Sequence, residues 1–228
     1  MYLSKLILNV RHPGVMRAIA DVYRMHQLIW RGFPDQAEGG PGRILYRVDP
    51  ARAGQMDAVL VQSEKEPDWT EFCSPNGPFC CAQSKEITPK FVDGMRLQFL
   101  MRANPTVLRL FPPKPGEPEP KQKRIGLYLE AEQRAWLTGE WKEGSAPDWI
   151  ARRQSKSDLA GFCVEDLRVD SPGKVFGKKP DGTRLEFQVV EYRGTLTIQD
   201  MQAFLQAFEG GIGSGKGFGF GLLSVART

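Results

Sequence analysis

Histidine and cysteine are scarce in this sequence. Its 228 residues include only two histidines, His12 and His26, and four cysteines, none of which lie in a C-x-x-C motif. The adjacent Cys80 and Cys81 cannot form an ordinary unstrained disulfide with each other. The sequence contains neither an H-x-x-x-H motif nor a cluster of Cys, His or carboxylate residues. The composition therefore excludes a miniature disulfide scaffold, and we expect reduced cysteines, no bound metal and no cofactor.

Long apolar runs are also lacking. The apolar stretch near the start, residues 6–8 and Val10, is interrupted by Asn9 and falls far short of the ~18 residues that span a bilayer. We expect no signal peptide, no transmembrane helix and no membrane partner, and we expect the protein to work in the cytoplasm. With 41% hydrophobic and 25% charged residues, the chain has the composition of a globular protein of one or two domains.

Positive charge is modest overall but unevenly distributed. The formal net charge is +4, which by itself indicates no polyanionic partner. Residues 96–124 hold seven lysines and arginines against two glutamates, which exceeds the charge excess of the whole chain. Binding a phosphate backbone requires several cations on one surface, although most charge runs are only solvated faces. The candidate phosphate contacts are Lys121, Lys123, Arg124, Arg152, Arg153 and Lys156.

The apolar pattern predicts the same order of elements twice. The first series is a strand, a long amphipathic helix, two strands, a weak helix and a strand, at residues 2–10, 15–33, 44–48, 58–61, 69–72 and 81–87. The second has a strand at 95–101, a Pro- and Lys-rich hairpin or loop at 112–123, an extended segment at 125–129, helices at 131–141, 147–160 and 198–208, and strands at 162–169, 185–192 and 218–225. Two successive βαββαβ units predict an α+β fold of two tandem ferredoxin-like (RRM-like) domains, residues 1–89 and 95–228.

The helix predicted at residues 15–33 carries a candidate catalytic pair. Tyr23 and His26 are three residues apart, so a phenol and an imidazole could converge on one reacting group. At 100° per residue, however, the histidine falls within an apolar arc made of Val15, Ile19, Val22, His26, Ile29, Trp30 and Phe33. The pattern alone therefore favours a core histidine over a catalytic one.

The glycine-rich tail, residues 210–221, is the most unusual stretch. It matches most of a P-loop, but Gly217 stands where a Ser or Thr must hold magnesium, and only eleven residues follow Gly217. We therefore exclude a nucleotide cofactor. Small residues let backbone N–H groups approach an RNA phosphate, and the candidate contacts are Gly213, Ser214, Gly215 and Lys216. Residues 216–220 also match the opening of the RNA-recognition consensus, and a glycine-rich turn into an edge strand is an equally good interpretation.

Several motifs in a fixed order resemble those of one family. They are MYLSKLILN at residues 1–9, DVYRMH at 21–26, RANPT at 102–106, residues 149–153 leading to the GF pair at 161–162, and the tail from residue 211 to 223. Together they resemble the CasE family, the CRISPR repeat-processing endoribonucleases of type I-E systems, over essentially the whole chain. The RANPT segment and the tail are specific in combination, whereas each alone is weak.

The resemblance implies a fold, a reaction and site residues. It implies two ferredoxin-like domains, and cleavage of precursor CRISPR RNA without metal at the base of each repeat's stem-loop. The partners would be the repeat RNA and the other subunits of Cascade. It places the catalytic histidine at His26 and the active-site tyrosine at Tyr23, the backbone contacts at residues 211–221, and the basic helix at Arg152 and Arg153.

The sequence departs from the family pattern beside the candidate pair. Members commonly have Pro before the tyrosine and Arg after the histidine, where this chain has Val22 and Gln27. Arg24 or Arg31 are the candidates to replace the missing phosphate contact.

The expected reaction is transesterification by the ribose 2′-OH, with His26 as general acid or base. Two alternatives remain open at this point: a non-catalytic subunit that binds structured RNA, and an enzyme of small phosphate compounds on the same fold.

Overall fold

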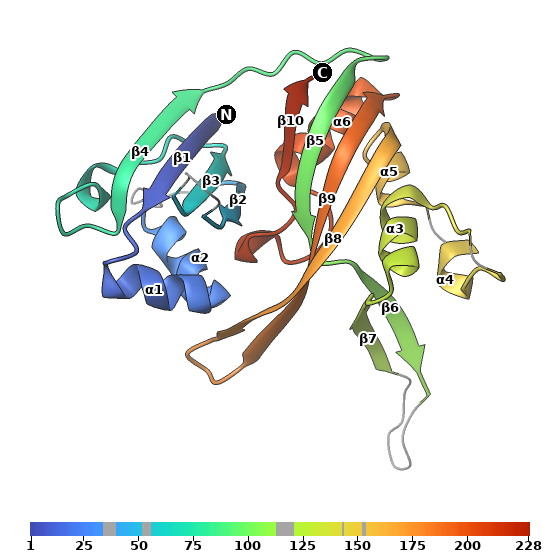
Figure 1. The fold of residues 1–228 in the computed structure, drawn as a ribbon, viewed down its shortest axis with the longest axis horizontal. Coiled ribbons are helices and arrows are strands. Elements are labelled where there is room, and N and C mark those ends of the chain that lie inside the picture. Colours follow the sequence, from blue (N-terminus) through green and yellow to red (C-terminus); the bar gives the residue numbers. More distant parts are fainter. Residues whose placement is uncertain (34–39, 52–55, 113–120, 143, 152–153) are drawn as a thin grey trace.

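Two four-stranded antiparallel sheets form the framework of the protein (Figure 1). The structure is a computed structural model that describes residues 1–33, 40–51, 56–112, 121–142, 144–151 and 154–228. Within these ranges no helix is both long enough and apolar enough to cross a membrane.

The first sheet has the strand order β2-β3-β1-β4. Its strands are β1 (Tyr2–Leu8), β2 (Ile44–Asp49), β3 (Ala58–Ser63) and β4 (Phe79–Glu86). The helices α1 (Pro13–Ala20) and α2 (Val22–Trp30) join β1 to β2, and the 3-10 turn η1 (Thr70–Phe72) precedes β4. Alternate residues of β1, Leu6 and Leu8, pack beneath Met25 and Ile29 of α2 in one apolar core. This is the topology of a ferredoxin-like unit, with the second helix reduced to η1.

The second sheet repeats that topology with the order β10-β5-β9-β8. Its strands are β5 (Arg96–Ala103), β8 (Phe162–Lys178), β9 (Arg184–Ile198) and β10 (Leu223–Arg227). The helices are α3 (Glu130–Thr138), α4 (Asp148–Ala151), α5 (Lys156–Leu159) and α6 (Met201–Gly210). A projecting hairpin of β6 (Thr106–Phe111) and β7 (Lys121–Gly126) is inserted after β5 (Figure 1). The predicted pair of ferredoxin-like folds is confirmed.

The prediction of one helix over residues 15–33 is wrong, because the chain breaks into two helices at Asp21. The extended backbone of Asp21 ends α1, and its carboxylate accepts hydrogen bonds from the backbone N–H groups of Tyr23 at 2.8 Å and Arg24 at 3.3 Å. Asp21 is therefore the N-cap of α2. The break changes the direction in which the side chains on either side of it face. Ile19 and Trp30 therefore do not lie in the core, as the arc of a single helix predicted, and are 39% and 38% exposed.

Other predicted elements also differ from the structure. The strands expected at 162–169 and 185–192 are the longer β8 and β9, and β6 was not predicted. The helix expected at residues 147–160 is the two short helices α4 and α5, and the helix expected at 198–208 begins only at Met201, after its N-cap Asp200. The strand expected at 218–225 begins at Leu223, and Lys216–Phe218 is instead a 3-10 turn, η2. The match to the RNA-recognition consensus at 216–220 is therefore wrong, because that consensus lies on a strand whose aromatic residues stack on bases.

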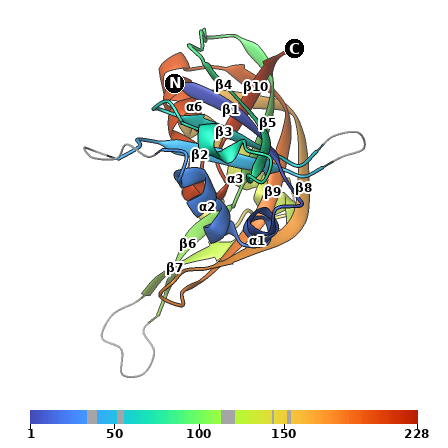
Figure 2. The same cartoon turned by 90° about the vertical axis from the view of Figure 1, so that its left-hand side faces the viewer.

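The far end of the long hairpin β8–β9 leaves its own sheet and packs beside α1 and α2 (Figures 1 and 2). At Gly177 a Cβ atom would stand only 2.9 Å from both Asp21 Oδ1 and Val22 Cγ2. Because glycine occupies this position, the hairpin can lie directly against the start of α2. The second half of the chain thus helps to hold the helix that carries the candidate pair.

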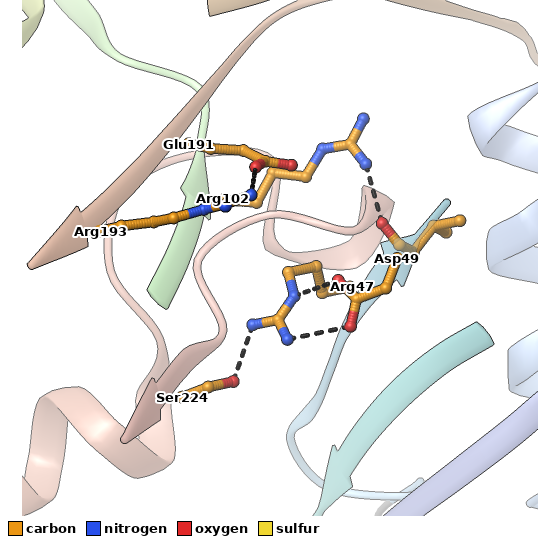
Figure 3. Close-up of polar contacts among 7 residues, drawn as sticks. Arg47, Asp49, Arg102, Glu191, Arg193 and Ser224 are labelled. Carbon is orange, nitrogen blue, oxygen red and sulfur yellow. Dashed lines mark hydrogen bonds and ion pairs between the residues drawn. The ribbon is translucent and has the colours of Figure 1, made fainter. Parts of the chain in front are cut away.

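Two arginines link the two sheets, the buried Arg47 and the half-buried Arg102 (Figure 3). Arg47 of β2 forms an ion pair with Asp49 at 2.6 Å and donates to the hydroxyl of Ser224 in β10 at 2.7 Å. From the other side, Arg102 of β5 donates to the backbone carbonyl of Val48 at 3.1 Å. All three side-chain nitrogens of Arg47 donate hydrogen bonds, whereas the buried Nε of Arg102 has no hydrogen-bond partner among the described residues. The bonds that do form, to Ser224 and to Val48, join the two sheets.

Candidate active site

His26 lies at the centre of an aromatic stripe on α2. Tyr23 and Trp30 are three residues before and four residues after it, so all three side chains share one face of the helix. The imidazole centroid is 6.2 Å from the ring of Tyr23 and 5.2 Å from that of Trp30. From the glycine-rich tail, Phe218 brings its ring to 5.6 Å. His26 is therefore half-buried among three aromatic rings rather than enclosed in the apolar core.

This environment favours the neutral form of the imidazole. Burial lowers the pKa of His26 below its ordinary value, and a hydrogen bond with the backbone of Gly217 partly opposes that shift. A neutral imidazole at pH 7 can accept a proton, and its conjugate acid can return one. The side chain is thus suited to either proton-transfer role.

The lowered pKa of His26 predicts a pH dependence of folding stability. Between the folded-state pKa and the unfolded value of about 6.5, the folded protein binds fewer protons than the unfolded chain. The free energy of unfolding should therefore rise with pH across this window, and the contribution of His26 should be lost as pH falls through its folded pKa. Urea unfolding of the wild type and His26→Gln between pH 5 and 7.5 measures this. Equal slopes for the two proteins would contradict it.

A cavity of about 830 Å³ opens beside this stripe and is lined by three arginines. Arg17 comes from α1 and Arg24 from α2, and Arg31 immediately follows α2. The guanidinium of Arg31 lies 5.3 Å above the ring centre of Phe72, and Arg24 lies 3.9 Å from Asp21. Gln27, which stands where the family commonly has arginine, also lines the cavity. Its walls thus combine a proton-transfer group with cations that attract an anion.

Sequence reasoning missed several lining residues of this cavity, among them His12, Arg17 and Trp30. Arg17 precedes Arg24 by seven residues, a helical spacing that could have indicated a shared surface. Trp30 was placed in the core because the predicted single helix put it on the apolar arc. In the part of the chain that the structure describes, no three His, Cys, Asp or Glu side chains form a group that could hold a metal ion.

The RANPT segment and the glycine-rich tail meet in the fold. The amide of Asn104 donates to the hydroxyl of Ser214 at 3.2 Å, and that hydroxyl also lies 3.2 Å from Oγ1 of Thr106. Arg124 in turn donates to Thr106 at 3.1 Å. A chain of hydrogen bonds therefore joins the base of the β6–β7 hairpin to the tail, whose Phe218 contacts His26.

The tail residues chosen as phosphate contacts have structural partners. Gly213 and Gly215 adopt φ values of +86° and +78°, a backbone conformation that favours glycine. The ammonium of Lys216 donates to the carbonyl of Gly210 at 2.8 Å, at the end of α6. Burial lowers the pKa of Lys216, and the nearby positive charge of Arg43 adds to that shift. The backbone conformation of the tail is therefore the first reason for its glycines.

The other predicted cations are dispersed over the second half of the chain. Lys121, Lys123 and Arg124 are exposed on β7, on a hairpin that projects away from α2 (Figure 1). The ammonium of Lys156 lies 5.9 Å from the ring centre of Trp136. Arg152 and Arg153 lie outside the described residues. The structure therefore brings Arg24 and Arg31 to the cavity of His26, and places the β7 cations on a separate surface.

Comparison with known proteins supplies the family. The family model described as "CRISPR associated protein" matches residues 1–227. The CRISPR-associated endoribonuclease Cse3 of Thermus thermophilus is 32% identical over 226 residues, covering 99% of this chain and 100% of that protein. The chain belongs to the CasE family. The Cascade subunit CasE of Escherichia coli is 31% identical over 229 residues, with 99% of each chain covered.

The similarity of this CasE family member extends to its three-dimensional structure. A structure of Cse3 bound to a 19-nucleotide RNA covers 100% of both chains, with 29% sequence identity and a TM-score of 0.76. The resemblance drawn from the sequence motifs is thereby confirmed, as is the two-domain ferredoxin-like fold. The alignment with that structure includes both sheets and the glycine-rich tail.

Proposed function

We propose that this CasE family member is a metal-independent endoribonuclease that binds the stem-loop of CRISPR repeat RNA and cleaves precursor CRISPR RNA. The observation that carries the proposal is His26, half-buried beside a cavity lined by three arginines, in a chain that aligns with an endoribonuclease over its full length. After cleavage the protein stays on its product. It is a subunit of Cascade, as the name of the Escherichia coli relative says of that protein. It works in the cytoplasm, where that RNA is made.

The reaction is an intramolecular transesterification. The ribose 2′-oxygen forms a bond to the adjacent phosphorus while the bond from phosphorus to the 5′-oxygen breaks. One proton leaves the 2′-OH and one is delivered to the leaving oxygen, and His26 carries out one of these transfers. Tyr23 orients the 2′-OH or the scissile phosphate, and Arg24 and Arg31 stabilise the charge that builds up on the phosphorane. The products are a 2′,3′-cyclic phosphate and a 5′-OH.

In this proposal the two halves of the chain have different roles, catalysis and RNA binding. Residues 1–89 form the domain with the catalytic helix, and residues 95–228 form the domain that holds the RNA stem. An A-form helix offers phosphates and 2′-OH groups more readily than base edges, so exposed cations suit it. In this proposal the stem contacts are Lys121, Lys123, Arg124, Arg152, Arg153, Lys156 and the backbone of residues 213–216.

Removal of two β7 cations should weaken RNA binding in a salt-dependent way. Lys121→Ala combined with Lys123→Ala should flatten the slope of log K against log salt by about 2, because each phosphate contact releases about one counterion. The cleavage rate at saturating protein should stay near that of the wild type. The matched control is Lys5→Ala with Lys85→Ala, which removes two exposed lysines from the first sheet. An unchanged slope in the β7 variant would remove these lysines from the interface.

The test of the proposed function uses the purified protein and a repeat RNA in EDTA. A second RNA carries a single 2′-deoxy nucleotide at the cut. We expect cleavage of the all-ribose RNA alone, with cyclic-phosphate and 5′-OH ends. Cleavage only after Mg²⁺ replaces EDTA, with 3′-OH and 5′-phosphate ends, would instead indicate metal-assisted hydrolysis. Tight binding without cleavage in any condition would make the protein a non-catalytic RNA-binding subunit.

A further inference from the structure

Trp30 stands at the edge of the cavity and is partly exposed to solvent. It is 38% exposed, although a tryptophan at this point of an apolar pattern is expected in the core. One side of the indole contacts the imidazole of His26, with ring centroids 5.2 Å apart, and the side chain also lines the cavity of about 830 Å³. The free part of the ring is therefore a flat aromatic surface directly beside the reacting group.

The rest of the cavity wall has the chemistry of a site for unpaired nucleic acid. Tyr23 and Phe72 add aromatic rings to the wall, and Arg17 and Arg31 add cations. Proteins hold single strands with this combination, because bases stack on aromatic side chains while cations neutralise the backbone. The free faces of an unstacked base are available for such contacts, whereas a base inside a duplex is already stacked on both sides.

We propose that Trp30 is the stacking platform for an unpaired nucleobase next to the scissile phosphate. The inference rests on the proposed function, because it takes the reacting phosphate to lie at His26. A general acid or base must come within about 2.6–3.2 Å of the oxygen it serves. The indole is the next ring along α2 from the imidazole, so it reaches the nucleotide that flanks the cut. Trp30 thereby positions the flanking nucleotide and the scissile phosphate for attack.

A double-mutant cycle between protein and RNA tests this contact. Single-turnover cleavage at saturating protein is measured for the wild type, Trp30→Ala and Trp30→Phe. The substrates are intact repeat RNA and two RNAs that lack the base on the 5′ or the 3′ side of the cut. We expect Trp30→Ala to slow cleavage of intact RNA about tenfold or more, and to have little further effect on one of the two abasic RNAs. Trp30→Phe keeps an aromatic face and should retain most of the activity.

Two outcomes separate this contact from a purely structural role of Trp30. If Trp30→Ala slows intact RNA and both abasic RNAs by the same factor, the indole only supports His26 and the proposal is overturned. Uncovering His26 in that way would also move the midpoint of the pH–rate profile upward, whereas loss of a stacking contact would leave the midpoint in place.

The failure of this inference is distinguishable from failure of the proposed function. If the wild type cleaves no RNA either in EDTA or with Mg²⁺, the endoribonuclease proposal fails, and the binding affinities of the same proteins and RNAs are compared instead. A stacking contact would then appear as weaker binding of intact RNA by Trp30→Ala, with no loss for one of the abasic RNAs. An equal loss of affinity for all three RNAs would overturn the role of Trp30.

Discussion

His26→Ala should slow single-turnover cleavage of repeat RNA by about 10²–10⁴-fold. Removal of the imidazole leaves the 2′-OH or the leaving 5′-oxygen without its proton-transfer partner. RNA affinity should be nearly unchanged, because the proposed stem contacts lie on the second domain and His26 contributes no fixed charge at pH 7. Rapid-quench kinetics at saturating protein and a separate titration with labelled RNA measure the two quantities independently.

The other histidine of the chain provides a matched control. The imidazole of His12 accepts a hydrogen bond from the backbone N–H of Gly14 at 3.1 Å and thereby caps α1. His12 also lines the cavity of His26, but its imidazole already serves as the N-cap of α1. His12→Asn keeps a good N-cap residue, so folding and cleavage should both persist if His26 alone transfers the proton. Cleavage by His26→Ala at the rate of the wild type would show instead that His26 only fills space between the aromatic rings.

Gly221→Ala should destabilise the protein and displace the tail. Gly221 has φ +85°, where a side chain is strained, and a Cβ atom there would stand 2.6 Å from the backbone oxygen of Ile212. The backbone groups of Gly221 also bond to Ile212 and Arg102, at 2.9 and 2.8 Å, so the segment has little freedom to move. The backbone strain alone costs roughly 1–3 kcal/mol. Each kcal/mol lowers the Tm of a chain of this size by about 2–4 °C.

The same substitution four residues earlier is the control for Gly221→Ala. A Cβ atom at Gly217 would have its nearest neighbour, Nδ1 of His26, at 3.8 Å, which is ordinary van der Waals contact. Gly217→Ala should therefore leave thermal stability nearly unchanged. Thermal melts of both variants, with cleavage assays below the melting range, measure the difference. Equal melting temperatures for the two variants would contradict a conformational role of Gly221.

The sequence was sufficient to predict the repeated ferredoxin-like order of strands and helices, but not the strand β6 or the breaks that divide two of the predicted helices. Alternating apolar residues marked the strands and a 3.6-residue period marked the helices, and these two periods follow directly from backbone geometry. The pattern did not reveal the break at Asp21, because an aspartate on the polar face suits the middle of an exposed helix as well as an N-cap. Only the backbone conformation, with the two N–H groups bonded to its carboxylate, distinguishes the two.

The candidate site was predictable only in part. Helical spacing placed Tyr23 beside His26, but periodicity favoured a core histidine, and the family motifs alone favoured catalysis. The structure explains why periodicity favoured a core position and the motifs favoured catalysis. Aromatic rings surround the imidazole of His26, and the same side chain borders an open cavity. The exposure of Trp30 could not be predicted, since it depends on the angle at which α2 restarts after Asp21.

By itself the sequence determined the two βαββαβ units, the family, and the residue types available for proton transfer and phosphate binding. These properties depend on local periodicity and on motifs that are contiguous in the chain. The tertiary structure alone decided which distant residues meet: Ser214 with Asn104, Phe218 with His26, and Gly177 with the start of α2. Such contacts join residues more than a hundred positions apart in the chain and depend on how distant elements pack, which no local pattern encodes.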